Sequence, residues 1–187
     1  MQLRYLSSPR LPAGFTAAEL LAVLAVMAIV VALAAPGFSG LIDRWRVRQA
    51  AEGLQSTLYY ARSEAIRRGG RVAMRKHPQN TDGCRQAATT QAWGCGWFVF
   101  VDSNRNGTRQ AGEELLQSVA PPTGLDIMRR PGGPVIQFDR YGMANGANIF
   151  SFTISPAAAG IASPATRTLC LASGGRIRIL EGEASCQ

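Results

Sequence analysis

Two arginines near the C-terminus have a spacing that suits phosphate binding. Arg176 and Arg178 alternate with Ile177 and Ile179. Side chains two residues apart in a β-strand point to the same face, so the isoleucines can enter a core while the arginines form a cationic edge. A guanidinium group binds two phosphate oxygens at once. The segment therefore predicts weak, sequence-independent contacts with DNA, and the alternative is a solvated strand face paired with nearby glutamates.

Other basic and aromatic residues are interpreted as structural. The chain has 187 residues and a formal net charge of +8, which fits anionic partners, but only the placement of particular arginines is informative. We interpret Arg129, Arg130 and Arg140 as ordinary loop charges. Trp93 and Trp97 flank Gly and Cys beside an apolar run, which favours core or turn anchors over base-stacking groups.

A single carboxylate interrupts an apolar stretch near the N-terminus. Glu19 is the only charged residue in Phe15–Ala35. As a helix, this stretch would measure about 30 Å, enough to cross a hydrocarbon core. A carboxylate at mid-membrane costs about 2.5–3.5 kcal/mol, and the cost falls near a helix N-terminus. The stretch predicts a transmembrane helix with Glu19 as a functional residue, and the alternative for Glu19 is a helix-start carboxylate.

The segment 102–113 has the spacing of an EF-hand calcium loop. Its side-chain oxygens come from Asp102, Asn104, Asn106 and Glu113. It follows an expected strand rather than a helix, has one carboxylate in its first half and contains two arginines. We therefore favour a hairpin turn built on Asn106-Gly107, with calcium binding as the alternative, and we expect no metal site and no cofactor.

The cysteines indicate an oxidising compartment such as a periplasm. They are Cys84, Cys95, Cys170 and Cys186. No CxxC pair occurs and the chain has one histidine, so the sequence does not support a zinc site. Four cysteines allow three pairings, and the local choice of Cys84–Cys95 and Cys170–Cys186 closes the shortest loops.

The sequence around these residues predicts one long helix followed by short strands. Apolar residues at three- to six-residue spacing between Leu41 and Arg68 indicate an amphipathic helix half, and Gly69-Gly70 should end it. Beyond Gly70, short apolar runs alternate with Gly, Pro, Asn and Ser, as in antiparallel sheets. The expected strands are Arg71–Arg75, Gly96–Val101, Leu115–Val119, Leu125–Met128, Val135–Phe138, Ile149–Ile154, Arg167–Ala172 and Arg176–Leu180.

The run Gly14-Phe15-Thr16-Ala17-Ala18-Glu19, followed by the apolar stretch, resembles a type IV prepilin signal. The resemblance implies that a prepilin peptidase cuts between Gly14 and Phe15 and that Phe15 is then N-methylated. It also implies that Glu19 is the assembly carboxylate. The physical reason is that a free amine buried in a helical bundle needs a counter-charge, which a neighbouring subunit's glutamate can supply.

Residues 61–69, 71–74 and 93–102, in this order, are similar to the GspH/FimT family of minor type IV pilins and type II secretion pseudopilins. The resemblance implies an α+β, pilin-like fold in which a long N-terminal helix packs on a β domain of two small antiparallel sheets. It also divides the chain into a cleaved leader (1–14), a transmembrane and assembly helix (15–38), an amphipathic helix half (39–70) and a periplasmic β-rich domain (71–187).

The family resemblance implies a filament subunit rather than an enzyme, and the sequence contains no Walker A, HExxH or GxSxG motif. We expect a single-pass inner-membrane protein that joins a pilus or pseudopilus with other pilin subunits. FimT-like pilins bind DNA in natural transformation, so Arg176 and Arg178 are the expected DNA contacts. The alternative is a GspH-type minor pseudopilin that acts in protein secretion without DNA, and the sequence leaves the choice of machine open.

Overall fold

The computed structural model describes residues 14–120, 122–146, 149–172 and 174–186, and the side chains of 33–37 are not among those described. The expected leader, apart from Gly14, lies outside the described residues. The chain divides into two compact units, Met1–Ser39 and Gly40–Gln187. Helix α1 (Ala17–Arg68) contributes to both units, and the β-strands all belong to the second.

In the first unit, α1 exposes large apolar side chains along its whole described length. Among the described residues, no helix of the structure is long and apolar enough to cross a membrane. The expected transmembrane helix over Phe15–Ala35 is therefore not supported. That expectation relied on an apolar run whose last residues, 33–35, have side chains outside the described set.

In the second unit, α1 buries one stripe of side chains. The buried residues recur every three to four positions, the period of an α-helix. They are Val47, Ala51, Leu54, Leu58, Ala61 and Ala65. The expected stripe began at Leu41 and Trp45, but both of these side chains are exposed, so its N-terminal end was placed too early.

The glycine pair ends the helix as expected. The Gly70 N–H donates to the Ala65 carbonyl at 2.7 Å, and the Gly69 N–H donates to the Ile66 carbonyl at 3.4 Å. Gly69 has a φ of 72° and Gly70 a φ of 96°, and residues with a Cβ adopt such positive values only at a cost in free energy. These bonds satisfy two carbonyls that the helix end would otherwise leave unpaired.

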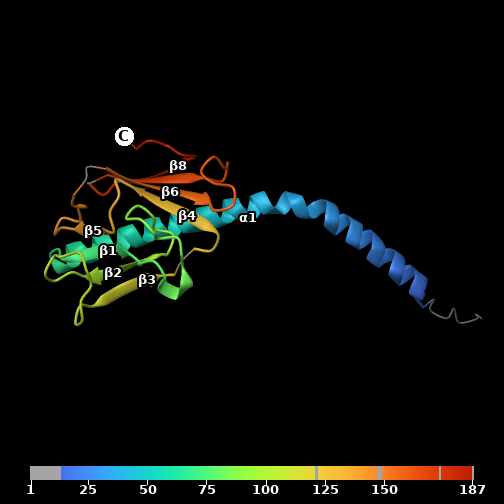
Figure 1. Ribbon diagram of the computed structural model, residues 1–187, viewed down its shortest axis with the longest axis horizontal. Coiled ribbons are helices and arrows are strands. Elements are labelled where there is room, and N and C mark those ends of the chain that lie inside the picture. Colours follow the sequence, from blue (N-terminus) through green and yellow to red (C-terminus); the bar gives the residue numbers. More distant parts are fainter. Residues whose placement is uncertain (1–13, 121, 147–148, 173, 187) are drawn as a thin grey trace, which may run out of the picture. The chain divides into compact units, whose positions relative to one another are not determined.

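Two four-stranded antiparallel sheets follow the helix (Figure 1). The first has the order β3 (Leu115–Val119), β2 (Trp97–Val101), β1 (Val72–Lys76) and β5 (Val135–Phe138). The second has the order β4 (Leu125–Arg130), β6 (Ile149–Pro156), β7 (Arg167–Ala172) and β8 (Ile177–Glu181). A 3₁₀ helix, η1 (Thr81–Gly83), lies between β1 and β2. All eight expected strands are present, so the α+β class with two sheets is confirmed.

The buried apolar side chains of α1 and of both sheets form one cluster. Leu54 and Leu58 belong to it together with Met74 of the first sheet and Phe152 of the second. Trp93 packs edge-on against Phe152, with ring centroids 5.2 Å apart. Trp93 and Trp97 are both fully buried, which confirms that they are core residues and leaves neither ring open to a base.

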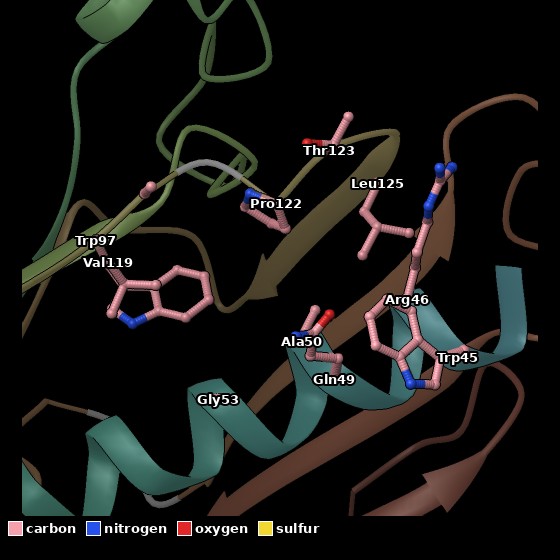
Figure 2. Close-up of a pocket in the computed structure, with 11 residues that line it drawn as sticks. Trp45, Arg46, Gln49, Ala50, Gly53, Trp97, Val119, Pro122, Thr123 and Leu125 are labelled. Carbon is pink, nitrogen blue, oxygen red and sulfur yellow. The ribbon is translucent and has the colours of Figure 1, made fainter. Parts of the chain in front are cut away.

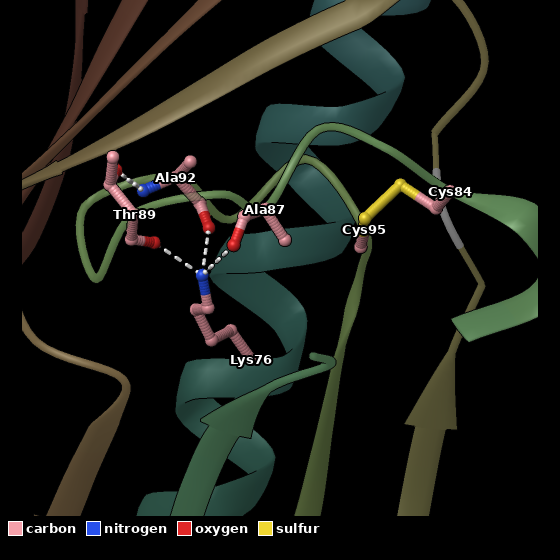
Figure 3. The surroundings of a disulfide bond; sticks show 6 residues. All are labelled: Lys76, Cys84, Ala87, Thr89, Ala92 and Cys95. Carbon is pink, nitrogen blue, oxygen red and sulfur yellow. Dashed lines mark hydrogen bonds between the residues drawn. A yellow bond between two sulfur atoms is a disulfide. The ribbon is translucent and has the colours of Figure 1, made fainter. Parts of the chain in front are cut away.

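The loop before β2 is held by a disulfide and by a buried lysine (Figure 3). Cys84 and Cys95 are bonded, as expected from their spacing. The Lys76 ammonium donates to the carbonyls of Ala87, Thr89 and Ala92, at 2.9, 2.5 and 2.7 Å. Burial lowers the pKa of Lys76, and the three carbonyl oxygens compensate its charge without a carboxylate.

Arg129 is a buried cation between the two sheets, so its interpretation as a loop charge is wrong. Its side chain on β4 is 4% exposed, and Nη1 donates to the carbonyls of Gly133 and Val135 at 2.6 and 3.1 Å. The guanidinium lies 4.7 Å from the ring centroid of Phe150. Burial lowers the pKa of Arg129 to about 10. The residue therefore links the second sheet to the chain entering β5.

We predict that Arg129→Lys lowers the free energy of unfolding by about 2 kcal/mol, because an ammonium cannot reproduce the paired carbonyl bonds and the contact with Phe150. Urea unfolding monitored by circular dichroism measures the change. Arg130→Lys is the control, since Arg130 is exposed and pairs with Glu183 at the surface. Equal effects of the two substitutions would contradict the role of Arg129.

An ion-pair network stabilises the C-terminal end of α1. Glu64 accepts N–H bonds from Arg67 and Arg68, and Arg68 also binds Glu114 at 2.7 Å. The bonds from Arg67 and Arg68 lower the pKa of Glu64 to about 2. Because Glu114 lies between β2 and β3, the network ties the helix end to the first sheet.

We predict that Glu64 makes the fold sensitive to acid. A folded-state pKa below the unfolded value of 4.5 gives stability that is present above pH 4.5 and is lost as the pH falls toward 2. Thermal unfolding between pH 6 and 2 should therefore show a smaller loss of Tm in Glu64→Gln than in the wild type. Glu52→Gln, an exposed position on the same helix, is the control and should follow the wild-type curve.

Candidate functional site

The first candidate region is the start of α1. Gly14 and Phe15 precede the helix and are exposed, Phe15 at 86%. The Glu19 carboxylate accepts bonds from the Thr16 N–H and hydroxyl, both at 2.9 Å, and the Glu19 N–H donates to the Thr16 hydroxyl at 3.2 Å. This reciprocal pair is a capping box. In the isolated chain, Glu19 thus occupies the helix-start position that the sequence offered as an alternative.

Apolar side chains follow Glu19 and remain uncovered. At least half of the surface of each is accessible in the single chain. They are Leu20, Leu21, Val23, Leu24, Val26, Met27, Ile29, Val30 and Val31. A contiguous apolar surface of this kind marks a site of interaction rather than a solvated face.

An apolar pocket of about 560 Å³ lies in the second unit, between α1 and the ends of β2 and β3 (Figure 2). Ala50 and Gly53 of α1 line one side, and Val119 and Leu125 line the other. Trp45, at the edge of this pocket, is 61% exposed. The pocket and Trp45 add to the apolar surface that the single chain leaves open.

The second candidate region is the arginine pair at the start of β8, with Arg176 directly before the strand and Arg178 within it. The register places Arg178 opposite Cys170, and Ile177 and Ile179 opposite Leu171 and Leu169. Both leucines are buried, so the isoleucines lie on the core side of the sheet and Arg178 on the other side, although Ile179, on the edge strand, is 36% exposed. Ile177 packs against the core cluster, whereas Arg176 is exposed and Arg178 is half-buried.

The two arginines line one small pocket of about 200 Å³ together with Ile149, Cys170 and Ala172. Cys170 is bonded to Cys186, so the expected pairing is confirmed and the C-terminal segment is attached beside the pocket. The glutamates that the sequence offered as partners have other arginine partners. Glu181 pairs with Arg167 at 3.2 Å, and Glu183 pairs with Arg130 at 3.1 Å.

A third arginine, which the sequence analysis missed, lies against the turn before β8. Arg62 extends from α1 so closely to Gly175 that a Cβ at position 175 would collide with its guanidinium group. Gly142 lies against the same side chain, and a Cβ there would be 2.6 Å from Arg62 Cγ. Gly175 is therefore needed for the helix to contact the turn before β8. No sequence spacing could indicate this, because the residues meet only after the sheet has formed on the helix.

The segment 102–113 connects β2 to β3 as a wide loop. The strands β2 and β3 pair as the expected antiparallel hairpin, but its turn is not a two-residue turn on Asn106-Gly107, because the loop residues with positive φ are Arg105 (60°), Gly107 (70°) and Gly112 (92°). A two-residue turn of the type favoured by Asn-Gly needs positive φ at both of its central residues. Within the described residues, no group of three His, Cys, Asp or Glu side chains is placed to hold a metal ion.

A family model described as type II transport protein GspH matches residues 50–175, which includes most of the second unit. The chain belongs to the GspH family. PilA1 of Thermus thermophilus, described as a pilin-like protein, is 30% identical over 167 residues, which cover 88% of this chain and 89% of PilA1.

The fold of this GspH-family chain is also that of a solved minor pilin. Two crystal forms of FimU, a type IV minor pilin of Pseudomonas aeruginosa, match with TM-scores of 0.52 and 0.54. The identities are 21% and 20%, and the matches cover 71% and 73% of this chain and 91% and 90% of FimU. The GspH family consists of structural pilin and pseudopilin subunits, in agreement with the expectation that the chain is not an enzyme.

Proposed function

We propose that the protein is a minor pilin-type subunit that assembles with other pilin subunits through the N-terminal half of α1. The exposed apolar surface of residues 20–31 carries this proposal, because a filament would remove that surface from water. Family membership and the likeness to FimU support it. The location that follows is the cell envelope.

Processing at the start of the helix is part of the proposal. Cleavage by a prepilin peptidase between Gly14 and Phe15 would leave Phe15 as the new N-terminus, and N-methylation would modify its amine. That amine would stand three residues before Ala18 and four before Glu19. Glu19 of a neighbouring subunit would then neutralise that amine when both are buried in the bundle. The capping box does not preclude this role, since a carboxylate has lone pairs beyond those that Thr16 uses.

We predict that Glu19→Gln leaves cleavage after Gly14 intact but lowers incorporation into filaments at least several-fold. Glutamine still accepts the bonds of the capping box, so the substitution removes the charge and keeps the helix start. Thr16→Ala is the matched control, since it disrupts the cap and retains the carboxylate. Quantitative immunoblotting of sheared filaments measures incorporation, and mass spectrometry of the mature protein should find an N-methylated Phe15. Normal incorporation of Glu19→Gln would exclude the assembly role.

We further propose that the arginine pair binds DNA without sequence specificity, which places the subunit in a type IV pilus used for DNA uptake. Arg176 and Arg178 line one pocket on the outer face of the second sheet, and the Cys170–Cys186 bond holds the adjoining chain. The guanidinium of Arg62 adds positive charge next to Gly175. Several guanidinium groups on a rigid strand and helix suit phosphate contacts.

The second candidate function is that of a minor pseudopilin in type II secretion, with no role for DNA. The description of the matching family model favours it. This function requires the same assembly helix and the same fold. The two candidates therefore differ only in what the arginine pair contacts.

We predict that Arg176→Gln with Arg178→Gln weakens DNA binding at least tenfold at moderate salt. The slope of log K against log salt concentration should also become shallower, by about 1 for each lost phosphate contact. Arg44→Gln with Arg48→Gln removes the same charge from an exposed part of α1 and should bind nearly as the wild type does. Mobility-shift titrations with duplex DNA at several salt concentrations measure both. No shift by the wild-type protein at low salt would favour the secretion candidate.

A further inference from the structure

The loop between β2 and β3 follows the 12-residue calcium-loop pattern in its hydrogen bonds as well as in its spacing. Asp102 holds position 1, Asn104 and Asn106 hold positions 3 and 5, Gly107 holds position 6 and Glu113 holds position 12. Gly107 has φ of 70°, and a Cβ there would lie 3.1 Å from Val135 Cγ1. The glycine is therefore required at this point, as the sharp turn of such a loop demands.

Hydrogen bonds close the loop on its own side chains. The Gly107 N–H donates to Asp102 Oδ2 at 2.9 Å, and the Ser103 and Gln110 N–H groups donate to Glu113 Oε1 and Oε2, both at 2.9 Å. Glu113 thus reaches back from the end of the loop to the residue that follows Asp102. The two carboxylates are brought to the same end of the loop although ten residues separate them.

The feature that indicates a ligand is an unpaired oxygen of Asp102. The side chain is 1% exposed, and Oδ1 is buried with no hydrogen-bond partner within the described part of the chain. Glu113 is also buried, and neither carboxylate forms an ion pair with a described lysine or arginine. Leaving an ionised carboxylate buried without a counter-charge costs free energy, and a bound cation would remove that cost.

We propose that the loop 102–113 binds one calcium ion. The side-chain ligands are Asp102 Oδ1, Asn104 Oδ1, Asn106 Oδ1 and the Glu113 carboxylate. Asn104 and Asn106 each accept one N–H, from Asn106 and Thr108, and an amide oxygen has a second lone pair for a metal. The carbonyl of Thr108 stands at position 7, where such loops supply a backbone ligand.

The ligand set selects calcium over other divalent ions. It consists of oxygen alone, whereas zinc, copper and nickel sites draw on nitrogen or sulfur ligands. Magnesium needs a tight octahedral shell and retains most of its waters, which a wide loop with a terminal carboxylate does not suit. Arg105 and Arg109 are part of the same loop and form no ion pair with its carboxylates, but their positive charge weakens its attraction for a cation, so the affinity belongs in the range of extracellular modules, about 10⁻⁴–10⁻³ M.

Calcium would act on the fold through residues next to the loop. Gln137 of β5 donates to Asp102 Oδ2 at 2.8 Å and to the Arg105 carbonyl at 2.9 Å. Glu114, which follows Glu113, pairs with Arg68 of α1. The loop therefore contacts β5 of the first sheet, the residue that follows it is paired with α1, and an ion bound in the loop would stabilise both connections.

The test is calcium titration of the full chain, kept in mild detergent because α1 exposes apolar side chains. Isothermal titration calorimetry should give one site per chain, and differential scanning fluorimetry should give a Tm that rises between EDTA and 10 mM CaCl₂. Equal concentrations of MgCl₂ should give a shift at least several-fold smaller. This outcome does not depend on assembly or on DNA binding.

Matched variants locate the ion. Glu113→Gln and Asp102→Asn should each weaken calcium binding at least tenfold, whereas Glu114→Gln, one residue further on, should bind as the wild type does. The calcium-dependent change in Tm is compared within each variant, so that a general loss of stability does not obscure the result. No calcium heat and no Tm shift in the folded wild type would overturn the proposal. Binding that survives both loop substitutions, or an equal response to magnesium, would overturn it as well.

Discussion

One stripe of small and branched apolar side chains on α1 packs against both sheets, and the buried apolar side chains of the second unit form one cluster around it. Ala51, Ala61 and Ala65 are buried along this stripe, and Leu54 and Leu58 belong to the same cluster as buried residues of both sheets. The stripe begins only at Val47. In the first unit, the same helix exposes the apolar side chains of residues 20–31 in the single chain, so its two parts differ in whether their apolar residues are buried.

Two buried cations attach loops to the strands of the two sheets. Lys76 and Arg129 lie inside the fold, and each directs its charge to backbone carbonyls instead of a carboxylate. Carbonyl dipoles can compensate a cation without adding a second buried charge, which avoids the desolvation of an ion pair. Both cations connect a strand to a loop that has no regular hydrogen-bonding pattern of its own, which explains why long side chains are used there.

The sequence allowed the long helix, the eight strands and both disulfides to be predicted, because each depends on neighbouring residues. Gly69-Gly70 ends the helix, and short apolar runs bounded by Gly, Pro and Asn form the strands. The errors concern contacts made after folding. The burial of Arg129 depends on carbonyls from another part of the chain, and Arg62 meets Gly175 only across the assembled domain. The turn of the β2–β3 hairpin was placed on Asn106-Gly107 because Asn-Gly is a strong local signal, whereas the carboxylate of Glu113 closes a wider loop by reaching back to its start.

The capping box of Thr16 and Glu19 has a consequence for the leader cleavage proposed above. Its bonds involve no residue before Thr16, so the helix can start at the same place whether or not the leader is attached. The bond between Gly14 and Phe15 lies outside the helix, in exposed chain. A protease needs an accessible, non-helical backbone, and here it would find one without unwinding anything. Precursor and mature subunit would then differ in charge and length at the terminus while sharing the same helix start.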